Sequence, residues 1–111
     1  YGVRDLILGE AADIVQTDIT RVGGFTEMLK VAALTQAWNL RFAPHAMEYL
    51  HMHLAAALPN AMFVERLDIF EPLNARLFPS APVPVAGKLR LPEGPGLGLE
   101  PDWDFVRAGG M

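Results

Sequence analysis

Short helical patterns alternate with short apolar runs along most of this sequence, and this alternation restricts the fold more than any other feature. The apolar runs, which predict buried strands, cover residues 13–18, 40–45 and 61–67. Apolar residues at helical spacing cover residues 3–11, 27–38 and 46–58. Helices that alternate with strands across short joints predict βα units on a parallel sheet. The sequence therefore predicts an α/β fold.

The middle helix carries end signals of its own. Thr26 is the predicted N-cap, because its hydroxyl can accept a hydrogen bond from the first turn. Asn39 can end the helix in a left-handed conformation, which asparagine tolerates better than most residues. The predicted apolar face of this helix consists of Met28, Val31, Leu34 and Trp38.

The sequence changes in character near residue 70, after which most of its nine prolines and many of its ten glycines occur. Because proline is excluded from helix interiors, residues 71–111 are expected to form an extended tail with a short strand at "GKLRLP" (87–92). The run "PGLGLE" (95–100) superficially resembles a phosphate-binding glycine loop. It lacks the preceding strand and the following helix that such a loop requires, so nucleotide binding is not expected.

Composition excludes several classes of protein. The net charge is −4 without any block of lysine or arginine, which argues against a surface for nucleic acid or for an anionic membrane. No apolar run approaches the roughly 18 residues of a membrane span, and the N-terminus lacks the pattern of a signal peptide. The absence of cysteine excludes disulfides and thiolate metal sites and fits a reducing compartment, so we expect a cytoplasmic protein.

Ionisable residues lie at or near the ends of all three predicted strands. Asp18 ends the first strand, His45 ends the second, and Glu65 lies near the end of the third. Each of them alone is more often a cap or a structural residue. Because the carboxyl ends of parallel strands share one edge, where α/β proteins build their active sites, we expect the three side chains to converge.

Two further histidines, His51 and His53, suggest a zinc site together with His45. They are two positions apart on a predicted helix, however, and therefore face different sides of it. We expect them to be packing or helix-surface residues.

Long stretches of the sequence have a familiar pattern. The runs "DIVQTDITRVGGFTEMLKVAALTQAWNLRFAPH" (13–45) and "HLAAALPNAMFVERLDI" (53–69), followed by "PGLGLE", resemble the C-terminal part of enolase-superfamily proteins of the mandelate racemase and muconate lactonising enzyme branch. The spacing of Asp18, His45 and Glu65 fits the mandelate racemase subgroup. The run "APHAMEYLHMHLAAALP" (43–59) resembles the acid-sugar dehydratases of that subgroup, such as the galactarate and talarate dehydratases.

The resemblance implies catalytic roles for these three residues. Asp18 and His45 would form a dyad in which His45 removes the proton α to a substrate carboxylate, and Glu65 would lie beside that carboxylate. Histidine titrates near neutral pH and therefore suits a general base, provided that a partner orients its ring. Mg²⁺ would stabilise the dianionic enediolate that proton removal produces.

The resemblance also implies a larger fold than this chain provides. Residues 1–70 would form the last βα units of a (β/α)7β TIM-type barrel, and residues 71–111 would return toward a capping domain. The helical pattern begins almost at Tyr1, so we expect a chain that starts within a fold. The three acidic Mg²⁺ ligands would precede Tyr1, and no residue of this chain is expected to bind the metal. The remainder of the barrel would come from a longer polypeptide or a companion chain, in an assembly expected to be a homo-oligomer.

Three functions remain open on the sequence alone, besides a fourth option, an inactive superfamily relative, against which the presence of Asp18, His45 and Glu65 together argues. The first is acid-sugar dehydration, in which His45 could also protonate the departing hydroxyl group. The second is racemisation or epimerisation of a 2-hydroxy acid, with a second base on the opposite face of the α-carbon. The third, from a different class, is a non-catalytic structural module, which would have to fold by itself. Exposed strand edges argue against that option, and the isolated chain is expected to be inactive.

Overall fold

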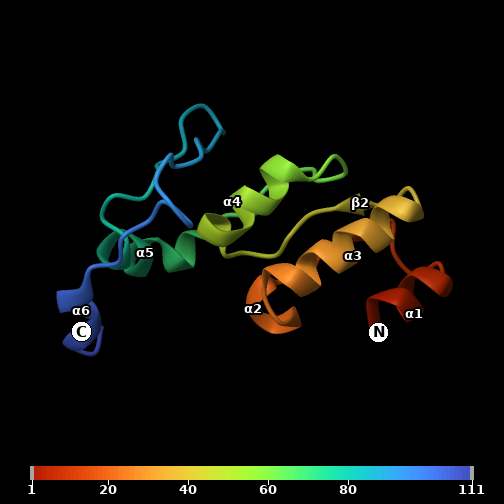
Figure 1. Cartoon of the computed structure of the whole chain (residues 1–111), viewed down its shortest axis with the longest axis horizontal. Coiled ribbons are helices and arrows are strands. Elements are labelled where there is room, and N and C mark those ends of the chain that lie inside the picture. Colours follow the sequence, from red (N-terminus) through yellow and green to blue (C-terminus); the bar gives the residue numbers. More distant parts are fainter. Residues whose placement is uncertain (1, 111) are drawn as a thin grey trace. The chain divides into compact units, whose positions relative to one another are not determined.

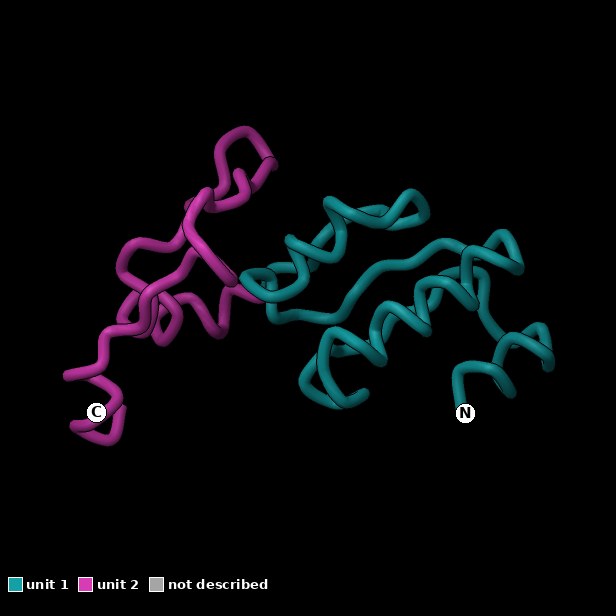
Figure 2. Tube along the Cα trace, in the orientation of Figure 1, with its two compact units in different colours: residues 1–66 teal, residues 67–111 magenta. Residues whose placement is uncertain are grey.

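The computed structural model describes residues 2–110, and the chain divides into two compact units, residues 1–66 and residues 67–111 (Figure 2). The elements of the first unit are α1 (Gly2–Leu8), β1 (Ile14–Val15), α2 (Ile19–Val22), α3 (Phe25–Ala37), β2 (Arg41–Phe42) and α4 (Glu48–Ala57) (Figure 1). Those of the second are the 3-10 turn η1 (Asp68–Phe70), α5 (Glu71–Leu77) and α6 (Trp103–Arg107). No helix in the described residues is long and apolar enough to cross a membrane.

The strands of the first unit are parallel, as the alternation of elements predicts, but they are shorter than the predicted runs. In the paired strands Ile14 lies opposite Arg41 and Val15 opposite Phe42. The predicted third strand is reduced to a single parallel bridge between Phe42 and Ala61. Short parallel strands are weakly held without neighbours on both sides, which accounts for the shortening.

Backbone hydrogen bonds nevertheless continue past β1 and β2 toward the candidate site residues. The amide of Ala43 donates to the carbonyl of Val15 at 3.1 Å, and the amide of His45 donates to the carbonyl of Thr17 at 2.9 Å. The intervening Pro44 has no amide hydrogen to contribute. These bonds fix the two chain segments side by side up to the positions of Asp18 and His45.

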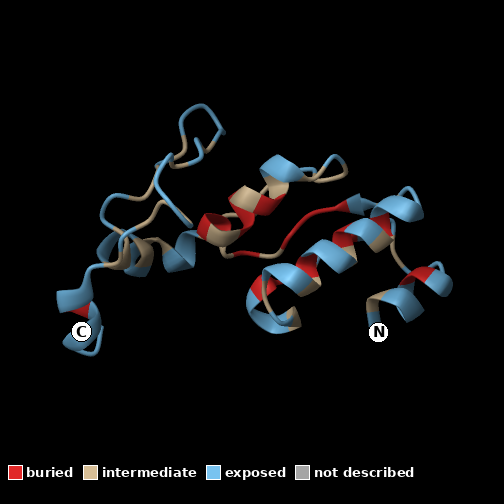
Figure 3. Cartoon of the chain, viewed as in Figure 1, coloured by how far each residue is buried: buried red, intermediate tan, exposed pale blue. Residues whose placement is uncertain are grey.

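The core of the first unit lies where α3 and α4 pack against β2 (Figure 3). Its buried members are Ile19, Met28, Ala32, Phe42 and Leu54. Phe42 and Met28 have no exposed surface. Removing a large apolar side chain from such a core typically costs about 3–5 kcal/mol, so this cluster holds the strand ends in place.

The start of α3 differs from the prediction, whereas its end confirms it. The N-cap is Gly24, not Thr26, because the chain turns at φ 90° and ψ −169°, a conformation essentially restricted to glycine. Asn39 is left-handed with φ 57°, as expected. The amide of Leu40 donates to the carbonyl of Thr35, and that of Asn39 to the carbonyl of Gln36, which together form a Schellman motif.

The buried face of α3 is also rotated from the predicted one. Met28 is buried as predicted, but Ala32 and Thr35 follow it into the core, and Trp38 is 49% exposed. The small side chains of Ala32 and Thr35 are well suited to close packing against a neighbouring segment. The Asn60 amide nitrogen donates to the Thr35 hydroxyl at 2.9 Å and to the Leu40 carbonyl at 3.2 Å. This tie lies at the end of the strands opposite His45.

The second unit is less extended than predicted, because two short helices interrupt it. Asp102 caps α6 by accepting a hydrogen bond from the Phe105 amide, and the guanidinium of Arg76 in α5 lies 4.3 Å from the centre of the Phe105 ring. The predicted strand at residues 87–92 is wrong, since only an isolated bridge between Val85 and Lys88 forms there. The "PGLGLE" run is a turn, closed by a bond from the Gly98 amide to the Pro95 carbonyl.

Candidate active site

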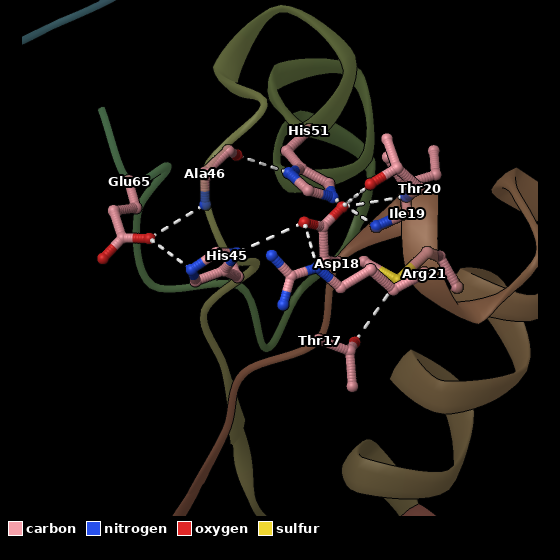
Figure 4. Close-up of polar contacts among 10 residues, drawn as sticks. Thr17, Asp18, Ile19, Thr20, Arg21, His45, Ala46, His51 and Glu65 are labelled. Carbon is pink, nitrogen blue, oxygen red and sulfur yellow. Dashed lines mark hydrogen bonds and ion pairs between the residues drawn. The ribbon is translucent and has the colours of Figure 1, made fainter. Parts of the chain in front are cut away.

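Asp18, His45 and Glu65 converge as the strand order predicts (Figure 4). Nδ1 of His45 lies 3.2 Å from Oδ2 of Asp18, and Nε2 of His45 lies 4.0 Å from Oε2 of Glu65. The imidazole therefore lies between two carboxylates. The Asp18 side chain is buried, whereas those of His45 and Glu65 are about one-third exposed.

The two oxygens of Asp18 have different partners. Oδ1 accepts from both the amide and the hydroxyl of Thr20, each at 2.8 Å, so Asp18 is also the N-cap of α2. Oδ2 lies close to His45 and at 3.4 Å from Nε of Arg21. The Arg21 side chain is 75% exposed, and an ion pair of that kind contributes little. Thr20 therefore orients the carboxylate and leaves Oδ2 for His45.

This arrangement selects one tautomer of His45. An ionised carboxylate can only accept hydrogen bonds, so the proton of the neutral imidazole must lie on Nδ1, facing Asp18. Nε2 then carries a free lone pair. A histidine with an anchored Nδ1–H and a free Nε2 has the form of a general base.

The pKa of Asp18 is consistent with an ionised partner for His45. Burial, the largest single influence, raises the pKa of this carboxyl group. The hydrogen bonds from Thr20 and from His45 lower it. The lowering effects dominate, so the pKa of Asp18 lies below its ordinary value of 3.8.

Glu65 is held by the backbone next to His45. Its Oε2 accepts a hydrogen bond of 2.8 Å from the amide of Ala46. The hydrogen bond to Ala46 does not use the second carboxyl oxygen of Glu65, Oε1. Ala46 is followed by Met47, and both residues have left-handed backbones, with φ of 48° and 43°. Such strain is characteristic of functional sites.

The structure also places His51 at the site, whereas the sequence analysis expected a packing or helix-surface residue. It has no exposed surface, and its ring contacts the backbone of Ile19 and Ala46. The expectation of a packing residue is confirmed only in part, because its two ring nitrogens bond to the loops that carry Asp18 and His45. A signal was present in the sequence: His51 is at helical spacing from Leu54 within α4 and from the flanking Met47 and Leu58, all of which belong to or pack against the core.

The described residues contain no group of three or more acidic or histidine side chains arranged to hold a metal ion. The residues present therefore do not fit a magnesium site by themselves. A cavity of about 840 Å³ runs along α1 and α3, but none of Asp18, His45 and Glu65 lines it.

Comparison with known proteins identifies the family. The enolase C-terminal domain-like family matches residues 1–105. The chain belongs to this family. It has the mixed α/β fold of the C-terminal part of TIM-type barrel enzymes, which confirms the resemblance drawn from the sequence.

Two of the relatives of this chain are sugar-acid dehydratases. The chain is 36% identical to the L-rhamnonate dehydratase of Saccharopolyspora erythraea, and the match covers 96% of the chain and 30% of that relative. The structure of L-talarate dehydratase from Polaromonas sp. JS666, complexed with Mg and L-glucarate, is 39% identical with a TM-score of 0.82, covering 96% of the chain and 28% of that protein. The chain thus spans about 30% of the length of its curated relative.

A third relative supports the branch. A mandelate racemase/muconate lactonizing enzyme from a marine actinobacterium is 27% identical with a TM-score of 0.83, covering 95% of the chain and 30% of that protein. The family's solved relatives thus include both a dehydratase with bound magnesium and a protein of the racemase and lactonising branch.

Proposed function

We propose that this chain is the C-terminal barrel segment of a Mg²⁺-dependent acid-sugar dehydratase, with His45 as general base, Asp18 as its orienting partner and Glu65 beside the substrate carboxylate. The observation that carries the proposal is the contact of His45 Nδ1 with Asp18 Oδ2 at 3.2 Å, which leaves Nε2 available for a proton. The similarity to an L-rhamnonate and an L-talarate dehydratase supports the substrate class.

In the proposed reaction Nε2 of His45 takes the proton from the carbon next to the carboxylate. The electron pair of the broken C–H bond moves into the carboxylate to give an enediolate. When this electron pair returns, it forms a double bond to the next carbon and expels the hydroxyl group of that carbon. The hydroxyl group leaves as water after receiving a proton from protonated His45. The resulting enol rearranges to a 2-keto acid. Asp18 stabilises the imidazolium between the two proton transfers.

Mg²⁺, held by residues outside this chain, would stabilise the negative charge on the substrate carboxylate. Within the chain, Glu65 would do so by a hydrogen bond. Oε2 of Glu65 accepts from the Ala46 amide, and a protonated Glu65 could donate a hydrogen bond to the substrate oxygen where charge develops. The proposal therefore requires a protonated Glu65 during the reaction. The other strands of the barrel belong to the rest of the polypeptide or to a companion chain.

A racemase or epimerase of a 2-hydroxy acid is the second candidate, favoured by the similarity to the actinobacterial mandelate racemase/muconate lactonizing enzyme. It would use His45 in the same way but return a proton to the α-carbon. The two reactions differ in their products. In D₂O a racemase gives substrate labelled at the α-carbon, whereas a dehydratase gives a 2-keto acid.

The test uses the complete protein with Mg²⁺ and a set of acid sugars that includes L-rhamnonate, L-talarate and galactarate. We expect 2-keto acid from the wild type. His45→Asn should lower kcat by about 10²- to 10⁴-fold, the usual contribution of a general acid–base residue, without changing the affinity for Mg²⁺. Loss of Mg²⁺ affinity in this variant would make His45 a ligand, and undiminished turnover would remove it from the mechanism.

A further inference from the structure

The loops that carry Asp18 and His45 are joined by one buried side chain. His51, in the second turn of α4, accepts a hydrogen bond at Nε2 from the amide of Ile19 at 3.0 Å. Its Nδ1 lies 2.6 Å from the carbonyl oxygen of Ala46. Ile19 directly follows Asp18, and Ala46 directly follows His45. Figure 4 shows the His51 ring between these two segments.

The partners of His51 determine its protonation state. A backbone carbonyl can only accept, so Nδ1 of His51 must donate to Ala46. A backbone amide can only donate, so Nε2 must be unprotonated to accept from Ile19. Only the neutral Nδ1–H tautomer satisfies both bonds. Both ring nitrogens are therefore engaged, and neither is available to substrate or metal.

Ala46 is held on both sides by these contacts. Its amide donates to Glu65, and its carbonyl accepts from His51. Ala46 and Met47 are left-handed non-glycine residues, each of which costs on the order of 1–3 kcal/mol unless surrounding contacts impose it. The two hydrogen bonds supply such contacts. The strained turn after His45 is thus fixed relative to both carboxylates.

We propose that His51 is a positioning residue that sets the distance between His45 and Asp18 and orients the turn that holds Glu65. The expected effect of His51 on turnover rests on the proposed function, whereas its effect on the distance between His45 and Asp18 does not. A rigid ring with two opposed hydrogen bonds fixes a spacing that flexible side chains would leave variable. Displacing a catalytic group by about 1 Å can cost about 10²-fold in rate.

Three substitutions in the complete protein separate the two bonds. His51→Asn retains a donor near the Nδ1 position for Ala46, His51→Gln retains an acceptor near the Nε2 position for Ile19, and His51→Leu retains neither. His53→Gln is the matched control: His53 lies on the same helix, and its Nε2 has no hydrogen-bond partner among residues 2–110. Circular dichroism and Mg²⁺ affinity serve as checks that each variant is folded.

We expect His51→Leu to lower kcat by about 10- to 100-fold, with KM changed by less than about threefold. His51→Asn and His51→Gln should recover part of the loss, and His53→Gln should behave as wild type. If His51→Leu does not fold, the Asn and Gln variants still give the comparison. Equal kcat in all four variants, or a change in KM alone, would overturn the proposal.

A second readout does not depend on turnover. The Nδ1–H proton of His45, hydrogen-bonded to Asp18, should give a downfield NMR signal that shifts upfield or disappears in His51→Leu and persists in His53→Gln. A wild type that converts no acid sugar would contradict the proposed function, yet this signal would still test the role of His51. An unchanged signal in His51→Leu would refute that role.

Discussion

At the scale of single residues, the two oxygens of Asp18 explain why asparagine is a poor substitute. In Asp18→Asn the amide oxygen can still accept from Thr20, which places the NH₂ group toward Nδ1 of His45. Nδ1 must then become an acceptor, and the ring proton moves to Nε2, where the base is needed. We expect kcat to fall by about 10²- to 10⁴-fold with little change in fold. Steady-state kinetics with circular dichroism measure both, and wild-type kcat would remove Asp18 from the mechanism.

The lowered pKa of Asp18 also predicts a pH dependence of stability. Because the pKa is lower in the folded state than the ordinary 3.8, ionised Asp18 stabilises the fold fully above the unfolded-state value. That contribution is lost as the pH falls through the folded-state pKa. In denaturant titrations the free energy of unfolding of wild type minus that of Asp18→Asn should shrink as the pH falls below about 4. A difference that does not vary with pH would contradict this.

At the scale of helices and strands, the two glycines that begin α1 and α3 should respond oppositely to alanine. A Cβ added at either position would have no packed neighbour within 4 Å, so crowding is not at issue. Gly24 has φ 90°, and Gly24→Ala should destabilise by about 1–2 kcal/mol. Gly2 is helical, and Gly2→Ala should stabilise by about 0.5–1 kcal/mol. Chemical denaturation measures both, and a neutral Gly24→Ala would mean that the turn rearranges freely.

The order of elements and the convergence of the site were predictable from the sequence, but their details were not. Strand-end positions place Asp18 and His45 together because the connection between parallel strands brings equivalent ends to one edge. The N-cap at Gly24 was missed because Thr26 carries the usual capping side chain, whereas the turn depends on a backbone conformation. The apolar stripe around His51 indicates burial, but its hydrogen-bond partners are backbone groups of Ile19 and Ala46, which a sequence pattern does not specify.

At the scale of the whole chain, the parallel strands of residues 1–66 have only one neighbour each apart from a single bridge to Ala61. Large apolar side chains such as Ile14, Leu29 and Phe63 are 45%, 48% and 52% exposed. We therefore expect residues 1–66 expressed alone to bind a hydrophobic dye and to unfold without a cooperative transition. The complete protein should show a sharp transition under the same conditions. A cooperative transition in the isolated segment would favour the structural-module hypothesis.

The hydrogen bond between Asn60 and Thr35 fixes the end of the strands that lies opposite His45. His45 and Asp18 lie at the other end, in loops whose geometry depends on a few hydrogen bonds. In directed evolution the two ends would therefore tolerate change differently. Libraries that vary the loops around His45 should change activity, with the proposed sugar acids as test substrates, while the anchored end preserves the yield of folded protein. Variation at Asn60 would instead reduce that yield for every substrate alike.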